Sequence, residues 1–321
     1  MSGSSILITG GDGFVGRWVC DLLSRRDYRI ISASRTAAER AGADAYRRIA
    51  LDLTGHDDLR PLLEGVDCIV HLAARTHVMR DSAADPLREY RRVNTEGTAK
   101  LATAAARAGV RRFVFLSSIK VNGERTTTRP YTATDEPHPE DAYGLTKWEA
   151  ERALRAVEAR TGMQVAILRP PLVYGPGVGA NFLRLMRLVA RGVPLPLGAV
   201  DNRRSMIYVG NLADAVRACV ETPQAAGETY LASDGADLST PQLIRAVAHA
   251  LGVEPRLFAM PVPWLAAAAA LLGQRATISR LTQSLQVDSS RLRGHLQWQP
   301  PFTAEAGLAE TAAWFHAVGS P

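Results

Sequence analysis

The stretch ILITGGDGFVG, residues 6–16, decides the fold of this chain of 321 residues. An apolar, β-rich run is followed at once by a glycine-rich turn and then by a helical pattern over residues 14–25. In such a turn Gly10 permits a sharp change of direction, Gly13 lets the backbone approach a pyrophosphate, and Gly16 lets the helix pack close to the strand. The phosphates would lie at the positive end of that helix, where free N–H groups point outward. The stretch therefore predicts a dinucleotide site, with a ligand-free glycine turn as the alternative.

Short apolar runs and helical patterns alternate through the rest of the first half. Further strands are expected at 28–33, 67–72, 112–116 and 165–168, and helices at 93–108 and 143–160. This alternation predicts an α/β fold with a Rossmann, doubly wound parallel sheet.

The second half has a different texture, because prolines and glycines crowd residues 170–179 and 192–198. We expect residues 1–170 to form the dinucleotide-binding domain, with a returning segment near 200–220 in which residues 206–209 rejoin the sheet. Residues 171–321 are then mainly a smaller, interleaved substrate-binding cap, which looks helical from about residue 222.

The end of the second strand bears on the choice between NAD and NADP. Residues 32–35 read SASR, without the carboxylate that often binds the ribose 2′-hydroxyl of NAD. Arg35 could pair with a 2′-phosphate or stack on adenine, or it could be a solvated surface residue. The sequence therefore slightly favours NADP(H) over NAD. Asp52 and Leu53 are expected beside the adenine, and HLAA, residues 71–74, under the cofactor, with His71 as a structural residue.

A second motif, YGLTK at residues 143–147, indicates proton transfer. The spacing of four places Tyr143 and Lys147 on one face of a helix. A tyrosine with a pKa near 10 is a poor base at neutral pH, and a neighbouring ammonium would lower that pKa. The expected strand at 112–116 ends in Ser117 and Ser118, which would lie at the carboxyl edge of the sheet, where ligands bind in such folds.

Together TGGDGFVG, HLAA, SSIKVNGE and YGLTK resemble the extended short-chain dehydrogenase/reductase family, and most strongly its nucleotide-sugar 4-epimerase and 4-ketoreductase group. The resemblance extends to LRPPLVYGPG at 168–177 and RRSMIYVGNLADAV at 203–216. It implies a catalytic triad of Ser118, Tyr143 and Lys147. It also implies that Asn94 supports the active site, with a role in core packing as the alternative.

The resemblance implies two sets of binding residues. The cofactor would be bound by Gly10, Gly13, Phe14, Val15, Gly16, Arg35, Asp52, Leu53, Leu72, Ala73, Ala74, Asn94, Ser117, Tyr143, Lys147, Pro170 and Val173. The nucleotide sugar would be bound by Ser118, Lys120, Asn181, Arg204 and Arg280, with Arg204 on its diphosphate.

Departures from the family patterns narrow the reaction. Dehydratases of the family carry an acidic pair after the catalytic serine or threonine, whereas this chain has Ile119 and Lys120. Epimerisation at C3 or C5 uses extra acid/base groups such as a cysteine, and Cys20, Cys68 and Cys219 are expected away from the site.

Two reactions at C4 of a UDP-hexose remain open. One is a 4-epimerase of UDP-glucose or UDP-N-acetylglucosamine with tightly bound NAD. The other is reduction of a UDP-4-keto-6-deoxy-(N-acetyl)hexosamine in bacterial surface-polysaccharide biosynthesis. Leu172 and Asn122 stand where UDP-galactose 4-epimerases have asparagine and tyrosine, and a less polar pocket slightly favours the reductase. A non-catalytic dinucleotide-binding sensor is a remote third possibility. Such proteins generally lose Tyr or Lys of the triad, whereas this chain retains Tyr143 and Lys147.

The composition places limits on partners. The net charge of +6 could suit an anionic partner or reflect scattered surface arginines, and no basic cluster with interleaved aromatics indicates nucleic-acid binding. The three cysteines form no CxxC pair, so no metal site or disulfide framework is expected, and with no export signal at the N-terminus we expect a cytoplasmic protein. VPWLAAAAALLG at 262–273 is about half the roughly 20 residues that span a bilayer. We expect a buried helix there, with shallow membrane contact as the alternative.

Two helices suggest how the chain could assemble. The family resemblance implies a homodimer in which the helices at 93–108 and 143–160 of each subunit form a four-helix bundle. An alanine-rich run at 102–108 permits close approach of helices, although it could equally pack inside the monomer.

Overall fold

The computed structural model describes residues 3–36, 46–55, 58–76, 85–271 and 273–319, and its centre is a parallel sheet in the order β3-β2-β1-β4-β5-β6-β9. All of its neighbouring strands run parallel. The strands are β1 (Ser5–Thr9), β2 (Arg29–Ser34), β3 (Arg47–Ala50), β4 (Cys68–His71), β5 (Arg112–Leu116), β6 (Gln164–Arg169) and β9 (Thr229–Leu231). The predicted Rossmann-type fold is confirmed.

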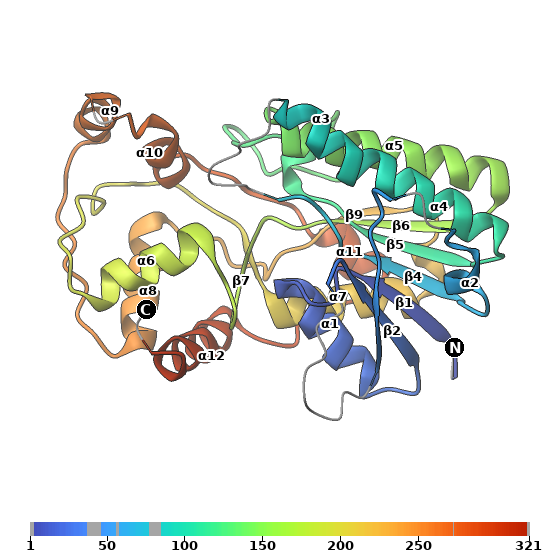
Figure 1. The fold of residues 1–321 in the computed structure, drawn as a ribbon. Coiled ribbons are helices and arrows are strands. Elements are labelled where there is room, and N and C mark those ends of the chain that lie inside the picture. Colours follow the sequence, from blue (N-terminus) through green and yellow to red (C-terminus); the bar gives the residue numbers. More distant parts are fainter. Residues whose placement is uncertain (1–2, 37–45, 56–57, 77–84, 272, 320–321) are drawn as a thin grey trace.

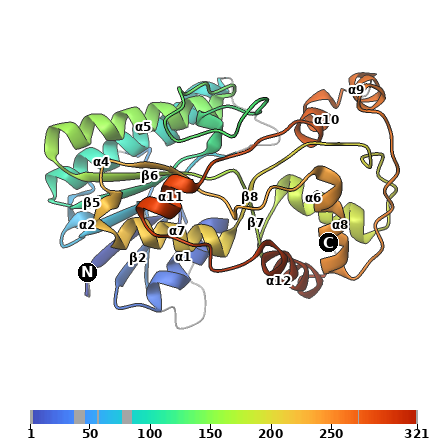
Figure 2. The ribbon, with the colours of Figure 1, turned by 180° about the vertical axis from the view of Figure 1, so that it is seen from behind.

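Helices cover both faces of this sheet (Figures 1 and 2). On one face α1 (Phe14–Ser24) and α7 (Val209–Glu221) bury Val19, Leu23 and Leu212 against the strands. On the other face lie α2 (Arg60–Leu63), α4 (Gly97–Arg107) and α5 (Ala142–Thr161). Because the strands are buried on both sides, they read as continuous apolar runs rather than as alternating ones.

The chain reverses its direction of travel across the sheet between β1 and β4. From β1 the order runs outward through β2 to β3, and then restarts at β4 on the other side. In open parallel sheets a crevice forms at the carboxyl ends of the strands at this switch point, and ligands bind there. The glycine turn after β1 lies at this position.

A second, mainly helical layer forms the cap at the other end of the molecule (Figure 1). It contains α6 (Ala180–Ala190), α8 (Thr240–Leu251), α9 (Val262–Leu271), α10 (Arg275–Thr282) and α12 (Ala304–Ala317). Its core includes Phe182, Ile244 and Phe315, all at most 3% exposed. The short strands β7 (Leu172–Tyr174) and β8 (Met206–Tyr208) pair with each other in a separate sheet.

Two expectations about the second half are wrong in detail. Residues 206–209 do not rejoin the large sheet, because β8 pairs only with β7 among the described strands, and α7 after it is what returns to the sheet. The segment after residue 222 is not all cap. A 3-10 turn (Pro223–Ala225) leads into β9, which occupies the edge beside β6, and α11 (Ser290–His295) packs on β9 through buried Leu292.

The helix expected at 93–108 starts earlier and is irregular. It begins as α3 (Pro86–Tyr90), where the Asp85 side chain accepts a hydrogen bond from the Arg88 N–H. It continues as a π-helical segment (Arg91–Glu96) and then as α4. Such π-helical insertions are frequently found at functional sites. The buried residue within it is Asn94.

The expectation of a buried helix at 262–273 is also wrong. Only Leu265 and Ala269 of α9 are buried, whereas Trp264 is 72% exposed and Leu271 is 89% exposed. In the part of the chain that the structure describes, no helix combines the length and apolar character needed to cross a membrane. The three cysteines are buried and free, and the described residues contain no group of metal-ligating side chains.

Candidate active site

The glycine turn is shaped for close approach of a ligand. Gly10 has φ of +74°, and a Cβ there would lie 2.7 Å from the Ala73 nitrogen. A Cβ on Gly16 would lie 2.1 Å from the Gly10 oxygen, so only glycine lets α1 come this close to the turn. The first turn of α1 has neither a capping side chain nor an acidic residue. Its free N–H groups and positive dipole end can therefore receive phosphate oxygens.

An ion pair that the sequence analysis did not predict spans the start of this turn. The Asp12 carboxylate accepts hydrogen bonds from Arg48 Nη1 at 2.6 Å and from Ser34 Oγ at 2.5 Å. Arg48 lies on β3 and Ser34 at the end of β2, so the turn after β1 is linked to the adjacent strand β2 and to β3 beyond it. Sequence patterns could not pair these residues, because β3 itself was not predicted.

The residues expected near the adenosine lie at this same edge. Arg35 is exposed just beyond β2. Asp52 is exposed and has a pKa below its usual value, first because the Thr54 backbone N–H donates to it, with a smaller contribution from the charge of Arg35. Leu53 is buried beside Gly97. The predicted Arg35 and Asp52 are thus close together, and Arg35 is available to a ligand.

At the end of β4, His71 is a structural residue. It is fully buried, with Nδ1 2.5 Å from Thr9 Oγ1 and Nε2 2.9 Å from Thr98 Oγ1. Burial lowers the pKa of His71 to about 3, with a smaller contribution from Lys147. The imidazole is therefore neutral and joins β1, β4 and α4. Leu72, Ala73 and Ala74 follow it at the sheet edge and are partly exposed.

Asn94 holds the loop after β4 against α5. Its Oδ1 accepts from the Arg75 N–H at 2.8 Å, and its Nδ2 donates to the Arg75 carbonyl at 3.1 Å and to Thr146 Oγ1 at 3.2 Å. Both ends of the amide are thereby occupied. The geometry accordingly fits a supporting role better than direct contact with a cofactor.

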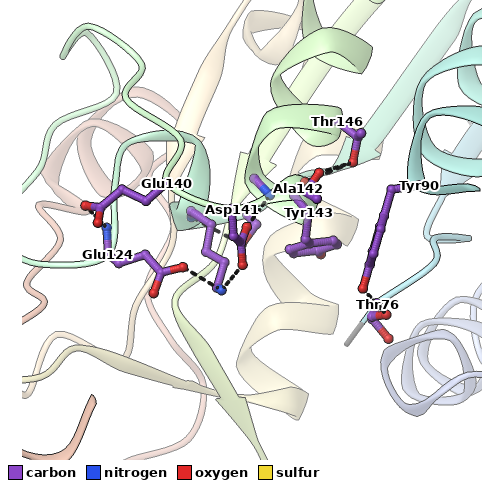
Figure 3. Close-up of polar contacts among 11 residues, drawn as sticks. Thr76, Tyr90, Glu124, Glu140, Asp141, Ala142, Tyr143 and Thr146 are labelled. Atoms are coloured by element: carbon purple, nitrogen blue, oxygen red, sulfur yellow. Dashed lines mark hydrogen bonds and ion pairs between the residues drawn. The ribbon is translucent and has the colours of Figure 1, made fainter. Parts of the chain in front are cut away.

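Tyr143 and Ser118 meet at the start of α5. Asp141 caps this helix by accepting a hydrogen bond from the Gly144 N–H at 2.7 Å. Tyr143, in the first turn, lies between Asp141 and Tyr90 (Figure 3), with its ring centroid 6.5 Å from that of Tyr90. Burial, followed by the negative charge of Asp141, raises the pKa of Tyr143, while a hydrogen bond with Ser118 lowers it. The phenol is therefore a proton donor or acceptor held in hydrogen-bond contact with a serine hydroxyl.

Lys147 lies one turn further along α5 and is 2% exposed. Its Nζ donates to the Leu116 carbonyl oxygen at 2.6 Å and lies 4.2 Å from the centroid of the Phe115 ring. Burial lowers the pKa of Lys147 to about 7, although the carboxylate of Glu151 raises it. The expectation was that this ammonium lowers the Tyr143 pKa. A hydrogen bond with Ser118 lowers the pKa of Tyr143, and the ammonium of Lys147, one turn away, is anchored on the carbonyl at the end of β5.

A buried polar network that the sequence analysis missed lies beneath this group. Arg169, at the end of β6, donates to both carboxylate oxygens of Glu151, at 2.9 and 2.5 Å. Ser117 Oγ donates to Glu151 at 2.5 Å, and Arg169 Nη1 donates to Asn122 Oδ1 at 3.0 Å. The side chains of Arg169 and Glu151 are 4% and 2% exposed. The hydroxyl of Ser117, expected to bind the cofactor, is thus directed to Glu151 instead.

Lys120 links the start of α5 to Glu124. Its Nζ lies 2.8 Å from Glu124 Oε1 and 2.5 Å from Asp141 Oδ2. Figure 3 labels these two acidic residues. Two carboxylates therefore neutralise the ammonium that was expected to contact the sugar. The main chain of Lys120 also approaches α5, since a Cβ on Gly144 would lie 2.6 Å from the Lys120 carbonyl oxygen.

The predicted substrate arginines lie together on the cap. Arg204 Nη1 donates to the Arg280 carbonyl at 2.9 Å and to the Gln283 carbonyl at 3.0 Å. Burial, followed by the positive charge of Arg280, lowers the pKa of Arg204, while Glu124 raises it. Glu124 also binds Lys120, so this basic pair is linked electrostatically to the group around Tyr143. Asn181 is exposed near the start of α6.

The remaining predicted residues surround the glycine turn and the end of β6. Phe14 and Val15 are partly buried at the start of α1 and pack against the cap core. The Pro170 carbonyl accepts from the Ile119 N–H at 3.0 Å, and Val173 lies on β7. Of the missed residues, Glu151 carries a recognisable pattern, because it lies four positions after Lys147 on the same face of α5.

The fold and the serine, tyrosine and lysine at its switch point define an enzyme of the short-chain dehydrogenase/reductase class. A model of the NAD dependent epimerase/dehydratase family matches residues 6–232. The chain therefore belongs to that family, as its motifs predicted.

Three known proteins illustrate the similarity. The chain is 43% identical over 314 residues to UDP-glucose 4-epimerase of Vibrio cholerae, covering 97% of this chain and 95% of that protein. It is 30% identical over 266 residues to N-acetyl-alpha-D-glucosaminyl-diphospho-ditrans,octacis-undecaprenol 4-epimerase of Escherichia coli O157:H7, covering 81% of this chain and 76% of that protein. The structure of UDP-glucuronic acid 4-epimerase from Bacillus cereus in complex with NAD matches with a TM-score of 0.79 at 20% identity, covering 98% of this chain and 99% of that one.

Proposed function

We propose that this protein is a UDP-hexose 4-epimerase that uses NAD and acts on UDP-glucose or UDP-N-acetylglucosamine. The observation that carries the proposal is the contact between Tyr143 and Ser118 at the carboxyl edge of the sheet, one helical turn from Lys147. The similarity to the Vibrio cholerae enzyme over nearly the whole of both chains supports epimerisation.

The residues of the first turn fit a dinucleotide. A Cβ at Gly10 or Gly16 would meet backbone atoms, which leaves only glycines where a pyrophosphate would approach. The uncapped start of α1 would bind the phosphates, and Arg35 and Asp52 would flank the adenosine. When bound, NAD supplies the chemistry of taking hydride from C4 of the hexose and returning it to the opposite face.

The side chains of the protein manage the proton. In its phenolate form Tyr143 accepts the proton of the C4 hydroxyl as that carbon is oxidised and gives it back when the 4-keto sugar is reduced. The ammonium of Lys147, one helical turn away, would stabilise that phenolate. Ser118 shares a hydrogen bond with the phenol and positions it. Arg204 and Arg280 would hold the diphosphate while the 4-keto hexose rotates to present its other face, because guanidinium groups pair well with phosphate oxygens.

The alternative is reduction of a UDP-4-keto-6-deoxyhexosamine with NADPH. One argument for it was a less polar pocket at Asn122 and Leu172. Asn122, however, is 1% exposed and bonded to the Thr132 carbonyl and to Arg169, so it does not shape a sugar pocket. Arg35 still leaves NADP(H) open, but the similarity to 4-epimerases favours the proposed reaction.

One set of measurements separates these possibilities. The purified protein is incubated with UDP-glucose or UDP-N-acetylglucosamine and no added cofactor, and the C4 epimer is followed by proton NMR. We expect conversion by the wild type, a loss of about 10³-fold or more in Tyr143→Phe, and NAD in the nucleotide released on denaturation. Oxidation of NADPH by a 4-keto-6-deoxy sugar, without interconversion of the two epimers, would contradict the proposal.

We also propose a homodimer formed through α4 and the adjacent α5. Ala102 and Ala105 of α4 are buried in the core, whereas Ala104 and Ala106, which also pack against it, remain partly exposed. Analytical ultracentrifugation should give twice the monomer mass of 34.7 kDa. A monomer at micromolar concentration would contradict this assembly.

A further inference from the structure

The helix α9 presents apolar side chains to solvent at the outer end of the cap. It contains no charged or polar residue, its sequence being VPWLAAAAAL. Trp264 and Leu271 are among the most exposed large hydrophobic residues of the described chain, at 72% and 89%. A helix on the surface of a globular protein usually turns a polar face outward, so this composition calls for a partner.

Two different faces of α9 can be distinguished. Leu265 and Ala269, four residues apart, are its buried residues and attach it to the cap. Trp264, Ala267, Ala268 and Leu271 are exposed and follow the i, i+3, i+4, i+7 spacing that brings side chains together on one face. We call these four residues the outer face of α9.

The segment around the outer face is basic. From residue 255 to residue 287 the sequence contains three arginines, Arg256, Arg275 and Arg280, and no aspartate or glutamate. All three arginines are exposed. Arg275 follows Leu271 by four residues, at the start of α10. An apolar helix face flanked in sequence by arginines has the composition of a helix that lies in the interface of an anionic bilayer.

The position of α9 leaves the outer face accessible to a large flat partner. Figures 1 and 2 show α9 and α10 at one end of the molecule, with α9 at the outermost corner, far from the strands of the large sheet. With 10 residues the helix is too short to span a bilayer, so it would lie along the surface.

We propose that α9 docks this protein on the surface of an anionic lipid membrane. Trp264 and Leu271 enter the region between headgroups and acyl chains, where tryptophan is enriched, and Arg256 and Arg275 pair with anionic headgroups. A second copy of the chain fits this face less well, because a symmetric contact would bring the arginines of both copies together.

Docking also places the substrate site near the membrane. Arg280 lies on α10, which packs against α9, and its carbonyl accepts from Arg204. The two arginines that would hold a diphosphate therefore lie on or beside a helix that packs against α9. The docking itself needs no assumption about the reaction.

The experiment uses the full chain and sedimentation with vesicles. One set contains equal parts of phosphatidylglycerol and phosphatidylcholine, and the other contains phosphatidylcholine alone. We expect binding to the anionic vesicles that weakens as salt is raised. Trp264→Asp and Leu271→Asp should each lower the bound-to-free ratio on the order of tenfold. The matched control is Val318→Asp, because Val318 is 54% exposed beyond the end of α12 and should leave binding unchanged.

Further measurements keep the result interpretable. Arg275→Glu reverses a charge without touching the apolar face, and we expect it to reduce binding to anionic vesicles even if Trp264→Asp misfolds. Turnover of a free UDP-sugar by the Trp264 variant should equal that of the wild type, so failure of docking and failure of the proposed epimerase activity are distinguishable. Absence of binding to anionic vesicles would overturn the proposal. Self-association of the wild type that Trp264→Asp abolishes, without vesicle binding, would also overturn it and assign the face to a second copy.

Discussion

Replacing Glu151 by glutamine tests whether the buried network under the active site stabilises the fold. Glu151 accepts three hydrogen bonds, one from Ser117 and two from Arg169, and the two charged side chains are 2% and 4% exposed. Glutamine keeps the shape but leaves the Arg169 guanidinium without a counter-charge. Breaking a buried pair in this way typically costs about 3–5 kcal/mol. Because glutamine retains one acceptor oxygen, we expect about 3 kcal/mol here.

The assay is urea unfolding followed by circular dichroism at equal cofactor loading. With a slope of roughly 3 kcal/mol per molar urea, the midpoint should fall by about 1 M. Glu149→Gln is the matched control, because Glu149 lies on the same helix and forms a bidentate pair with Arg91, which is 44% exposed. That solvent-exposed pair should contribute less than about 1 kcal/mol.

A second readout separates a positioning role from a purely structural one. The Glu151 carboxylate raises the pKa of Lys147, which burial holds at about 7. Removing the carboxylate should lower that pKa further, so the alkaline limb of the pH-rate profile should move to lower pH in Glu151→Gln. Equal destabilisation by the Glu149 and Glu151 variants, with an unmoved pH profile, would refute the reasoning.

Three further predictions follow from charges in and near the site. Lys147→Met should abolish epimerisation yet raise the urea midpoint at pH 7. Between about pH 7 and the ordinary lysine pKa, Lys147 is protonated in the unfolded wild type but deprotonated in the folded one, which destabilises the fold. This cost falls as the pH rises, so the gain from Lys147→Met should shrink toward pH 10. Burial lowers the pKa of His71 to about 3, so only the unfolded state takes up this proton between pH 7 and 5. The free energy of unfolding of the wild type should therefore fall by about 2 kcal/mol over this range, and that of His71→Gln should lack this loss in the same titration. Arg280→Gln should raise the KM for the UDP-sugar about tenfold with kcat little changed, whereas Arg275→Gln should not.

The glycine turn and the parallel sheet could be predicted because their signals are local. The sequence ILITGGDGFVG contains a strand, a turn and a helix start within 11 residues, and each glycine has a steric reason. The strands β3 and β9 were missed because they are short edge strands of four and three residues. Edge strands owe their place to the neighbour that they pair with, and a single sequence does not reveal that neighbour.

The triad could be anticipated for the same reason, since Tyr143 and Lys147 are four residues apart. The supporting contacts could not, because they join segments distant in sequence: Glu151 with Arg169, Asn94 with Thr146, and Asp12 with Arg48. The exposure of α9 was mispredicted because an apolar run is compatible with a protein core or with another apolar environment. Only the packing of the cap shows which of its faces is covered.

The hydrogen bonds from Arg48 and Ser34 to Asp12 affect any attempt to switch the preference between NAD and NADP. A designer would alter the polar side chains flanking the adenosine pocket, and Ser34 and Arg48 are obvious choices there. Both also bind Asp12, two residues beyond Gly10, and so link it to β2 and β3. Changing either one releases an anchor of the phosphate-binding backbone, so selectivity and affinity would shift together. Arg35 makes no described contact with Asp12, and it is the position at which the two properties can be altered separately.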